Sequence, residues 1–314
     1  MPTLSEYAKL SNDLLINGVF EHIVTESQLA EHLNFESFEG NALKYNRENA
    51  LPTASTYSVG STWEDTEPTY TAKSASLAIV GVQSPLDRYV LQTRSDQQSQ
   101  EAVLYAGMAK SLARKIEDLV ITGEPETVTT EFEGLDSLCR ADTRMMAMDD
   151  GVVDGAGAAE TELTIDRLDA MIDLVTGTPD ALIMNKTMRR KLTSISRASG
   201  SGFLSTERNS FGRRVTYYND TPIVIDDFIT DAEQYNAAST WPSSTATTIY
   251  AARFGRENQG HSIIHNGAVM TPDIQNVGIK EKANENLYRM VVYIQAVLWS
   301  AKRVAALGGI DSAA

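Results

Sequence analysis

Residues 95–125 read SDQQSQEAVLYAGMAKSLARKIEDLVITGEP, and this stretch decides the architecture of the chain. Ser95 and Gln98 have the spacing of a capping box, which predicts the start of a helix, and Gly123 with Pro125 predicts its end. One apolar stripe recurs between them at helical spacing: Leu104, Met108, Leu112, Ile116 and Leu119. At 1.5 Å per residue the helix runs about 40 Å, which is long enough to be the backbone of a domain.

Two shorter helices are predicted further along the chain. Thr164 is placed to cap the first, with Leu163 and Leu168 spaced as a hydrophobic staple. Asn185 caps the second, directly after a short apolar strand at 181–184. The chain therefore mixes helices with buried strands.

Alternating apolar patterns and turn residues predict further strands. They are a hairpin over 211–227 with its turn at Asn219-Asp220, a strand over 248–254, and a long strand over 287–299 that 304–307 continues. Together with the helices, these strands predict an α+β fold.

Upstream of the long helix, residues 41–85 change in character. Strand-like stretches at 43–47 and 70–80 flank residues 49–69, which hold few core-forming side chains, so we predict a long two-stranded excursion with a mobile tip. An isolated hairpin is marginal in water and gains stability from partners. Trp63, beside Glu64 and Asp65 near the tip, is more useful at an interface than in solvent. A surface loop without a partner stays an open alternative.

Two short amphipathic segments open the chain. Tyr7, Leu10 and Leu14 recur at helical spacing in the first, and a similar pattern follows over 20–24. Each apolar stripe needs a surface to lie on. A neighbouring copy and the chain's own core both meet that need, and the sequence does not decide between them.

Composition excludes several classes of protein. The 314 residues include 42 acidic and 27 basic side chains, giving a net charge of −15, the opposite of what a sequence-specific DNA-binding protein needs. An acidic surface would not grip DNA and would let it slide past, although plain solubility explains the same charge. Cys139 is the single cysteine, so no internal disulfide forms. No apolar run reaches about 18 residues and the first 15 residues do not resemble a signal peptide, so we expect no membrane span.

Catalytic and metal-binding motifs are sparse. The sequence contains no phosphate-binding loop and no dinucleotide fingerprint. His261 and His265 have the i, i+4 spacing of helical metal ligands, but the Ile-Ile pair between them predicts a strand, where such residues lie about 13 Å apart. Cys139 has no His partner close in sequence, and Asp226-Asp227 is typical of a solvated turn. We therefore predict no catalytic residue, no cofactor and no metal.

A basic cluster lies on the outer side of the predicted helix that follows Asn185. It contains Arg189, Arg190, Lys191 and Arg197. This cluster could meet an acidic patch on a neighbouring copy, or DNA, or could be a solvated helix face.

The order of these elements resembles the Hong Kong 97-type fold of tailed-bacteriophage major capsid proteins, which encapsulins share. The pieces that carry the resemblance are the helix at 95–122 with FEGLDSL at 132–138, ALIMNK at 181–186 with its helix, FGRRV…PIVIDD within 211–227, the strand at 248–255, and the closing run that ends LGGI at 307–310. The resemblance covers nearly the whole chain, through the order of the pieces more than any one motif.

The resemblance implies a division of the chain into parts. These are an N-terminal arm (1–40), an extended loop (41–82), a peripheral domain with the spine helix (83–163), an axial domain (164–254) and a return to the peripheral domain (255–314). It also implies pentamers and hexamers that enclose double-stranded DNA without sequence specificity, in a virion assembled in the host cytoplasm. The residues we expect at contacts between subunits are Tyr7, Leu10, Trp63, Glu64, Asp65, Arg189 and Arg190.

Further partners are implied with less support from the residues. The arm starts almost at Met1, so a separate scaffolding protein is the hypothesis, beside a portal and a decoration protein. Lys44 and Lys73 lie on the extended loop, but no motif identifies a partner for a covalent cross-link, and none is predicted. An encapsulin shell protein is the alternative, and a metal-dependent hydrolase that uses the histidine pair is a distant one.

Overall fold

The computed structural model describes residues 29, 31–89, 100–153, 160–200, 202–208, 214–231, 246–267, 272–281 and 283–313. The helices are α3 (Gln100–Thr122), α4 (Leu135–Ala141), α5 (Ile165–Asp173) and α6 (Lys186–Ser199), with a 3₁₀ turn at Ala301–Arg303. The strands are β1 (Phe35–Phe38), β2 (Ala42–Ala50), β3 (Thr69–Ser76), β4 (Ala78–Asp87), β5 (Met145–Ala147), β6 (Ala181–Met184), β7 (Leu204–Arg208), β8 (Arg214–Tyr218), β9 (Thr221–Ile225), β10 (Ala246–Ala252), β11 (His261–Asn266), β12 (Asp273–Ile279), β13 (Glu285–Leu298) and β14 (Val304–Asp311). This mixture confirms the predicted α+β class.

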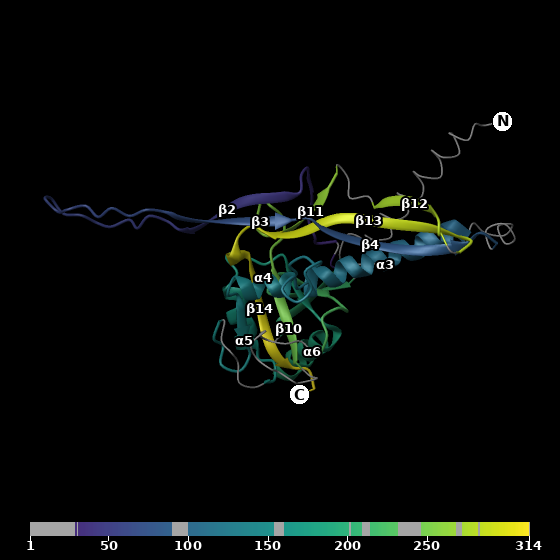
Figure 1. Cartoon of the computed structure of the whole chain (residues 1–314). Helices are drawn as coiled ribbons and strands as arrows, with labels where there is room; N and C mark the ends of the chain where they lie inside the picture. Colours follow the sequence, from purple (N-terminus) through teal and green to yellow (C-terminus); the bar gives the residue numbers. More distant parts are fainter. Residues whose placement is uncertain are drawn as a thin grey trace.

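An elongated five-stranded sheet lies along α3 (Figure 1). Its order is β1-β11-β13-β12, and β4 also pairs with β13. The predicted alternation along β13 is confirmed, because Tyr288, Met290, Val292 and Ile294 are buried in the core that α3 shares. Tyr293, on the other side of the sheet, is 38% exposed.

The five-stranded sheet and α3 form one body of the molecule. A seven-stranded sheet, in the order β5-β14-β10-β6-β9-β8-β7, forms the second body. Its central strands are covered on both faces, which is why β6 is apolar at every position. Ala181 and Ile183 belong to the core with α3 and α4, whereas Leu182 and Met184 belong to the core with α5 and α6. The sheet therefore has an α3/α4 face and an α5/α6 face.

Two glycines hold α4 against the end of α3. The Gly134 N–H donates to the Gly123 carbonyl at 2.8 Å. A Cβ at Gly134 would lie 2.6 Å from the Gly123 nitrogen and 2.7 Å from the Ile121 carbonyl oxygen, closer than real Cβ contacts allow. The close contact between Gly134 and Gly123 thus fixes the position of α4 relative to the end of α3.

β2 and β3 form a two-stranded hairpin that projects far from both bodies (Figure 1). The pairing runs from Ala42 opposite Ser76 to Ala50 opposite Thr69. The predicted second strand does not continue to residue 80 as one piece. It breaks at Leu77, after which β4 leaves the hairpin and pairs with β13.

Several local predictions are confirmed. The Asn185 side chain caps α6 by accepting the Met188 N–H at 2.8 Å. Asn219 and Asp220 have φ of 44° and 66°, as a two-residue turn between β8 and β9 requires. The apolar stripe of α3 is buried from Met108 to Leu119. Ser95 and Gln98, the predicted capping box, lie outside the described residues.

Other local predictions need correction. Residues 304–307 do not continue β13, because the chain turns at Ala301–Arg303 and β14 joins the seven-stranded sheet instead. Thr164 occupies the N-cap of α5, but its side chain makes no capping hydrogen bond. Asp226 is no solvated turn residue, since it is only 1% exposed.

Candidate interaction surfaces

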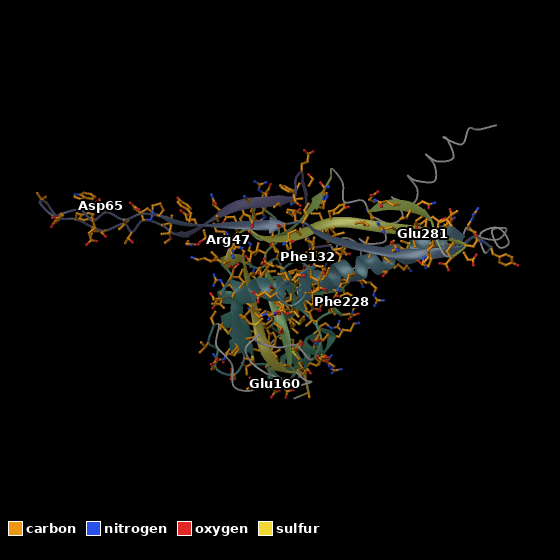
Figure 2. The ribbon with its side chains drawn as sticks, in the orientation of Figure 1. Arg47, Asp65, Phe132, Glu160, Phe228 and Glu281 are labelled. Carbon is orange, nitrogen blue, oxygen red and sulfur yellow. The ribbon has the colours of Figure 1, made fainter. Side chains whose placement is uncertain are left out.

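The tip of the hairpin presents an aromatic pair to solvent. Trp63 stacks on Tyr57 with ring centroids 4.0 Å apart, and the Glu64 N–H donates to the Tyr57 hydroxyl at 3.2 Å. Trp63 nevertheless remains 74% exposed, and Val59 is fully exposed. Asp65, labelled near the far end in Figure 2, is exposed as well. The tip therefore offers apolar surface bordered by carboxylates.

The base of the hairpin is tied firmly to the bodies. Arg47, which is labelled in Figure 2, donates to both carboxylate oxygens of Asp142, at 2.8 and 2.7 Å, and to the Leu298 carbonyl at 2.5 Å. Tyr45 donates to the same carbonyl at 3.0 Å and packs on Trp299. Burial raises the pKa of the Tyr45 hydroxyl. These contacts hold a hairpin whose tip has no core of its own.

The basic cluster lies where the sequence predicts it. Arg189, Arg190 and Arg197 are exposed on α6. Lys191 is half-buried and donates to the Asp311 carbonyl. Trp63, Glu64 and Asp65 lie on the hairpin tip, so the structure places these two predicted groups on different elements. Tyr7 and Leu10 lie outside the described residues.

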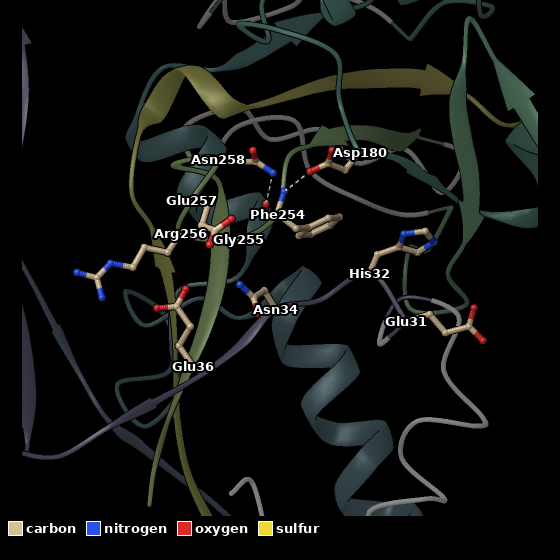
Figure 3. Close-up of a pocket in the computed structure, with 10 residues that line it drawn as sticks. All are labelled: Glu31, His32, Asn34, Glu36, Asp180, Phe254, Gly255, Arg256, Glu257 and Asn258. Atoms are coloured by element: carbon tan, nitrogen blue, oxygen red, sulfur yellow. Dashed lines mark hydrogen bonds between the residues drawn. The ribbon is translucent and has the colours of Figure 1, made fainter. Parts of the chain in front are cut away.

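A polar cleft of about 640 Å³ opens where residues 31–36 meet the loop after β10 (Figure 3). Asp180 accepts the Phe254 N–H at 2.8 Å, and the Asn258 side chain donates to the Phe254 carbonyl at 3.2 Å. Burial lowers the pKa of His32, partly offset by Glu31 and Asp180. These bonds fix the loop itself and do not align a nucleophile with a base.

The histidine pair lies on strand β11, as the sequence predicts. His261 is fully buried, neither of its ring nitrogens has a hydrogen-bond partner among the described residues, and burial lowers its pKa to about 4. Burial also lowers the pKa of His265. Burial raises the pKa of the Cys139 thiol well above its ordinary value. Within the described ranges, no group of three His, Cys, Asp or Glu is placed to hold a metal ion.

Sequence reasoning missed one ionisable group. Asp226 follows β9 and accepts the Phe228 N–H at 2.7 Å through Oδ1, while Oδ2 is buried without a partner in the described part of the chain. Burial raises its pKa to about 7, with further contributions from Glu117, Asp227 and Asp118. Two adjacent aspartates after a strand resemble a surface turn, and no local signal marks the first as buried.

Of the helices in the described part of the chain, none combines the length and the hydropathy that crossing a membrane requires.

No protein-family model and no curated protein matches the chain. Solved structures do match it along most of its length. An encapsulin from Synechococcus elongatus, solved as a holo complex, superposes with a TM-score of 0.67 at 16% identity, over 93% of this chain and 90% of that one. The capsid of a native GTA particle gives 0.59 at 13% identity, over 90% and 89%. Mycobacterium phage Bobi gives 0.57 at 14% identity, also over 90% and 89%. At such identities the similarity establishes the fold.

Proposed function

We propose that this chain, which has the Hong Kong 97-type capsid fold, is the major capsid protein of a tailed bacteriophage. In this function it assembles as pentamers and hexamers into the icosahedral head that encloses the phage DNA. The observation that carries the proposal is the projecting hairpin. Its base is fixed by the Arg47–Asp142 ion pair, yet Trp63 at its tip is 74% exposed. Such an exposed apolar tip can be buried against the surface of a neighbouring copy of the chain.

The same proposal assigns a role to each part of the chain. The extended loop is the hairpin within 41–82, and the peripheral domain (83–163 and 255–314) holds α3 and the five-stranded sheet. The axial domain (164–254) contributes α5, α6 and much of the seven-stranded sheet. Residues 1–40 form the arm. On this assignment the seven-stranded sheet joins the two domains, because β5 and β14 come from the peripheral segments.

The remaining roles belong to the same proposal. The chain works as a structural subunit and not as an enzyme, within the virion, after assembly in the host cytoplasm. A separate scaffolding protein, a portal and a decoration protein are its further partners, and packaged DNA contacts it without sequence specificity. The net charge of −15 suits an inner wall along which DNA slides.

The encapsulin similarity, with a TM-score of 0.67, supports a second candidate. In that case the same shell would enclose a cargo protein instead of a genome. The long hairpin favours the phage protein. Particle contents decide between the two, since double-stranded DNA and a cargo enzyme differ in absorbance and nuclease sensitivity.

Sedimentation velocity of the purified chain, alone and co-expressed with its neighbouring genes, tests the proposal. We expect species of the size of capsomers or closed shells. A chain that sediments as a monomer under every condition would contradict it.

A further inference from the structure

Helix α6 carries an arc of cations without a single carboxylate. Residues 185–200 contain five Lys and Arg and no Asp or Glu. At about 100° per residue, the exposed arginines Arg189, Arg190 and Arg197 share one side of the helix. Met188 and Leu192 are buried on the opposite side. These three arginines make no ion pair with any described residue, so their charge faces outward.

Helix α6 covers one face of the seven-stranded sheet, and the opposite α3/α4 face carries the opposite charge. Residues 117–136 contain seven Asp and Glu and no Lys or Arg. Some are neutralised internally, since Lys115 pairs with Glu131 at 3.3 Å and Arg140 with Glu124 at 3.1 Å. Glu126 is exposed and makes no ion pair with the described residues, and Glu133 is likewise exposed.

This acidic face is also concave. A cleft of about 470 Å³ lies between the loop that joins α3 to α4 and the start of β4. Glu131 and Glu133 line it together with Thr129, Thr130 and Gln295, whose side chains can accept hydrogen bonds. A planar guanidinium with five donors suits such a lining better than an ammonium does.

We infer that the arginine face of α6 in one copy docks on the acidic α3–α4 loop of the next copy within a capsomer. The inference rests on the proposed function and adds the pair of surfaces that join the subunits. Arg189, Arg190 and Arg197 supply the cations, and Glu126 and Glu133 supply the carboxylates.

The topology supports contact between copies. α6 packs on one face of the seven-stranded sheet and α3 with α4 on the other, so the sheet separates the two charged surfaces within one copy. A contact between two different surfaces of identical chains is heterologous, and repeating it generates a ring when the rotation closes. Pentamers and hexamers are such rings.

A second copy is a better partner for this face than DNA is. Each copy brings one basic and one acidic surface, so the ring matches them one to one. A chain with a net charge of −15 repels DNA as a whole, and this repulsion opposes phosphate binding at a single basic face. Contacts between exposed charges weaken with salt, so the rings should dissociate more readily at 1 M NaCl than at low salt.

Three charge-reversal variants of the full chain test the inference. The first is R189E/R190E/R197E, the second is E126K/E133K, and the third combines all five changes. Glu281→Lys, at an exposed position on the distant turn between β12 and β13, is the matched control. Sedimentation and negative-stain microscopy measure the assembled fraction, and thermal unfolding of the unassembled chains confirms that each variant folds.

We expect each separate set to lower the assembled fraction about tenfold, which corresponds to a modest loss of binding energy. The combined variant should recover to within about threefold of the parent, and Glu281→Lys should assemble normally. If both separate sets assemble like the parent, the inference fails while the proposed function stands. Separate losses without recovery in the combined variant would also overturn the pairing. Normal shells with less packaged DNA in the arginine variant would assign the basic face to DNA instead. A parent chain that never assembles would remove the proposed function and the inference together.

Discussion

Replacing Asp226 with Asn should abolish a pH dependence of stability that the buried carboxyl creates. Its folded pKa is about 7, against an ordinary value of 3.8. Because the folded pKa lies above the unfolded one, the native state binds the proton more firmly. The stability that this carboxyl contributes is fully present below about pH 4 and is lost as the pH rises through about 7.

The two pKa values set the size of the effect. Their difference corresponds to at most about 4 kcal/mol of unfolding free energy between pH 4 and pH 8. Asparagine keeps an oxygen for the Phe228 N–H and has no charge to bury. At pH 8 we therefore expect Asp226→Asn to be more stable than the parent chain by about 1 to 4 kcal/mol. Near pH 4 the two chains should be nearly equal.

Urea titrations of the unassembled chain at pH 4, 6 and 8 measure this difference directly. Asp227→Asn is the matched control, because Asp227 is exposed and pairs with Lys186 at 2.6 Å. That variant removes only one of the smaller contributions to the raised pKa of Asp226, so its stability at pH 8 should change far less than that of Asp226→Asn. A parent and an Asp226→Asn chain whose stabilities differ by the same amount at all three pH values would refute the reasoning.

Three further predictions concern the hairpin and the α3–α4 junction. Arg47→Ala leaves the Asp142 carboxylate without its main partner at a side chain only 10% exposed, so urea titration should show a loss of about 3 kcal/mol in the free energy of unfolding. Lys73→Ala removes the more distant partner of Asp142, a lysine whose side chain is 41% exposed, and should cost less than about 1 kcal/mol. Equal losses for the two variants would contradict the conclusion that Arg47 holds the base of the hairpin. Gly134→Ala forces a Cβ against backbone atoms, so thermal melts should show a loss of about 2 kcal/mol or more in the free energy of unfolding. In Gly202→Ala the new Cβ meets no atom within 4 Å, and this variant should melt nearly like the parent. Trp63→Ala should leave the unfolding of the unassembled chain within about 0.5 kcal/mol while it reduces the yield of shells, and an unfolding loss without an assembly defect would place Trp63 in the subunit's own stability instead.

The sequence predicts those parts of the fold that repeat a local pattern. The stripe of α3, the alternation along β13 and the Asn185 cap can all be recognised from residues that lie close together in the chain. The turn at Asn219-Asp220 is of the same kind, because its two positive φ angles suit those residue types.

Features that depend on distant contacts were not predictable in the same way. Asp142 lies in an unremarkable stretch, and only the folded chain brings it to Arg47, 95 residues earlier. Asp226 is buried, and Glu117 and Asp118 of α3 help to raise its pKa, but nothing in its neighbours along the chain signals this. The separation of β14 from β13 likewise depends on a short turn whose residues also suit a continuous strand.

The interaction surfaces were predictable in part. The sequence shows a tryptophan beside two acidic residues in a segment with few core-forming side chains, and a helix whose charged residues are all basic. In the structure Trp63, Arg189 and Arg190 are exposed, as these patterns predict. Which surface meets which depends on the faces of the seven-stranded sheet, and the sequence does not contain that information in any local form.

Electron microscopy of the expressed protein, alone and with its neighbouring genes, tests the central claim most directly. The account predicts uniform hollow shells or rings of five and six subunits, with each hairpin tip lying on another copy. Particles filled with double-stranded DNA would support the phage capsid, and particles filled with a cargo protein would favour the encapsulin. A stable, monodisperse monomer under every condition would contradict the account.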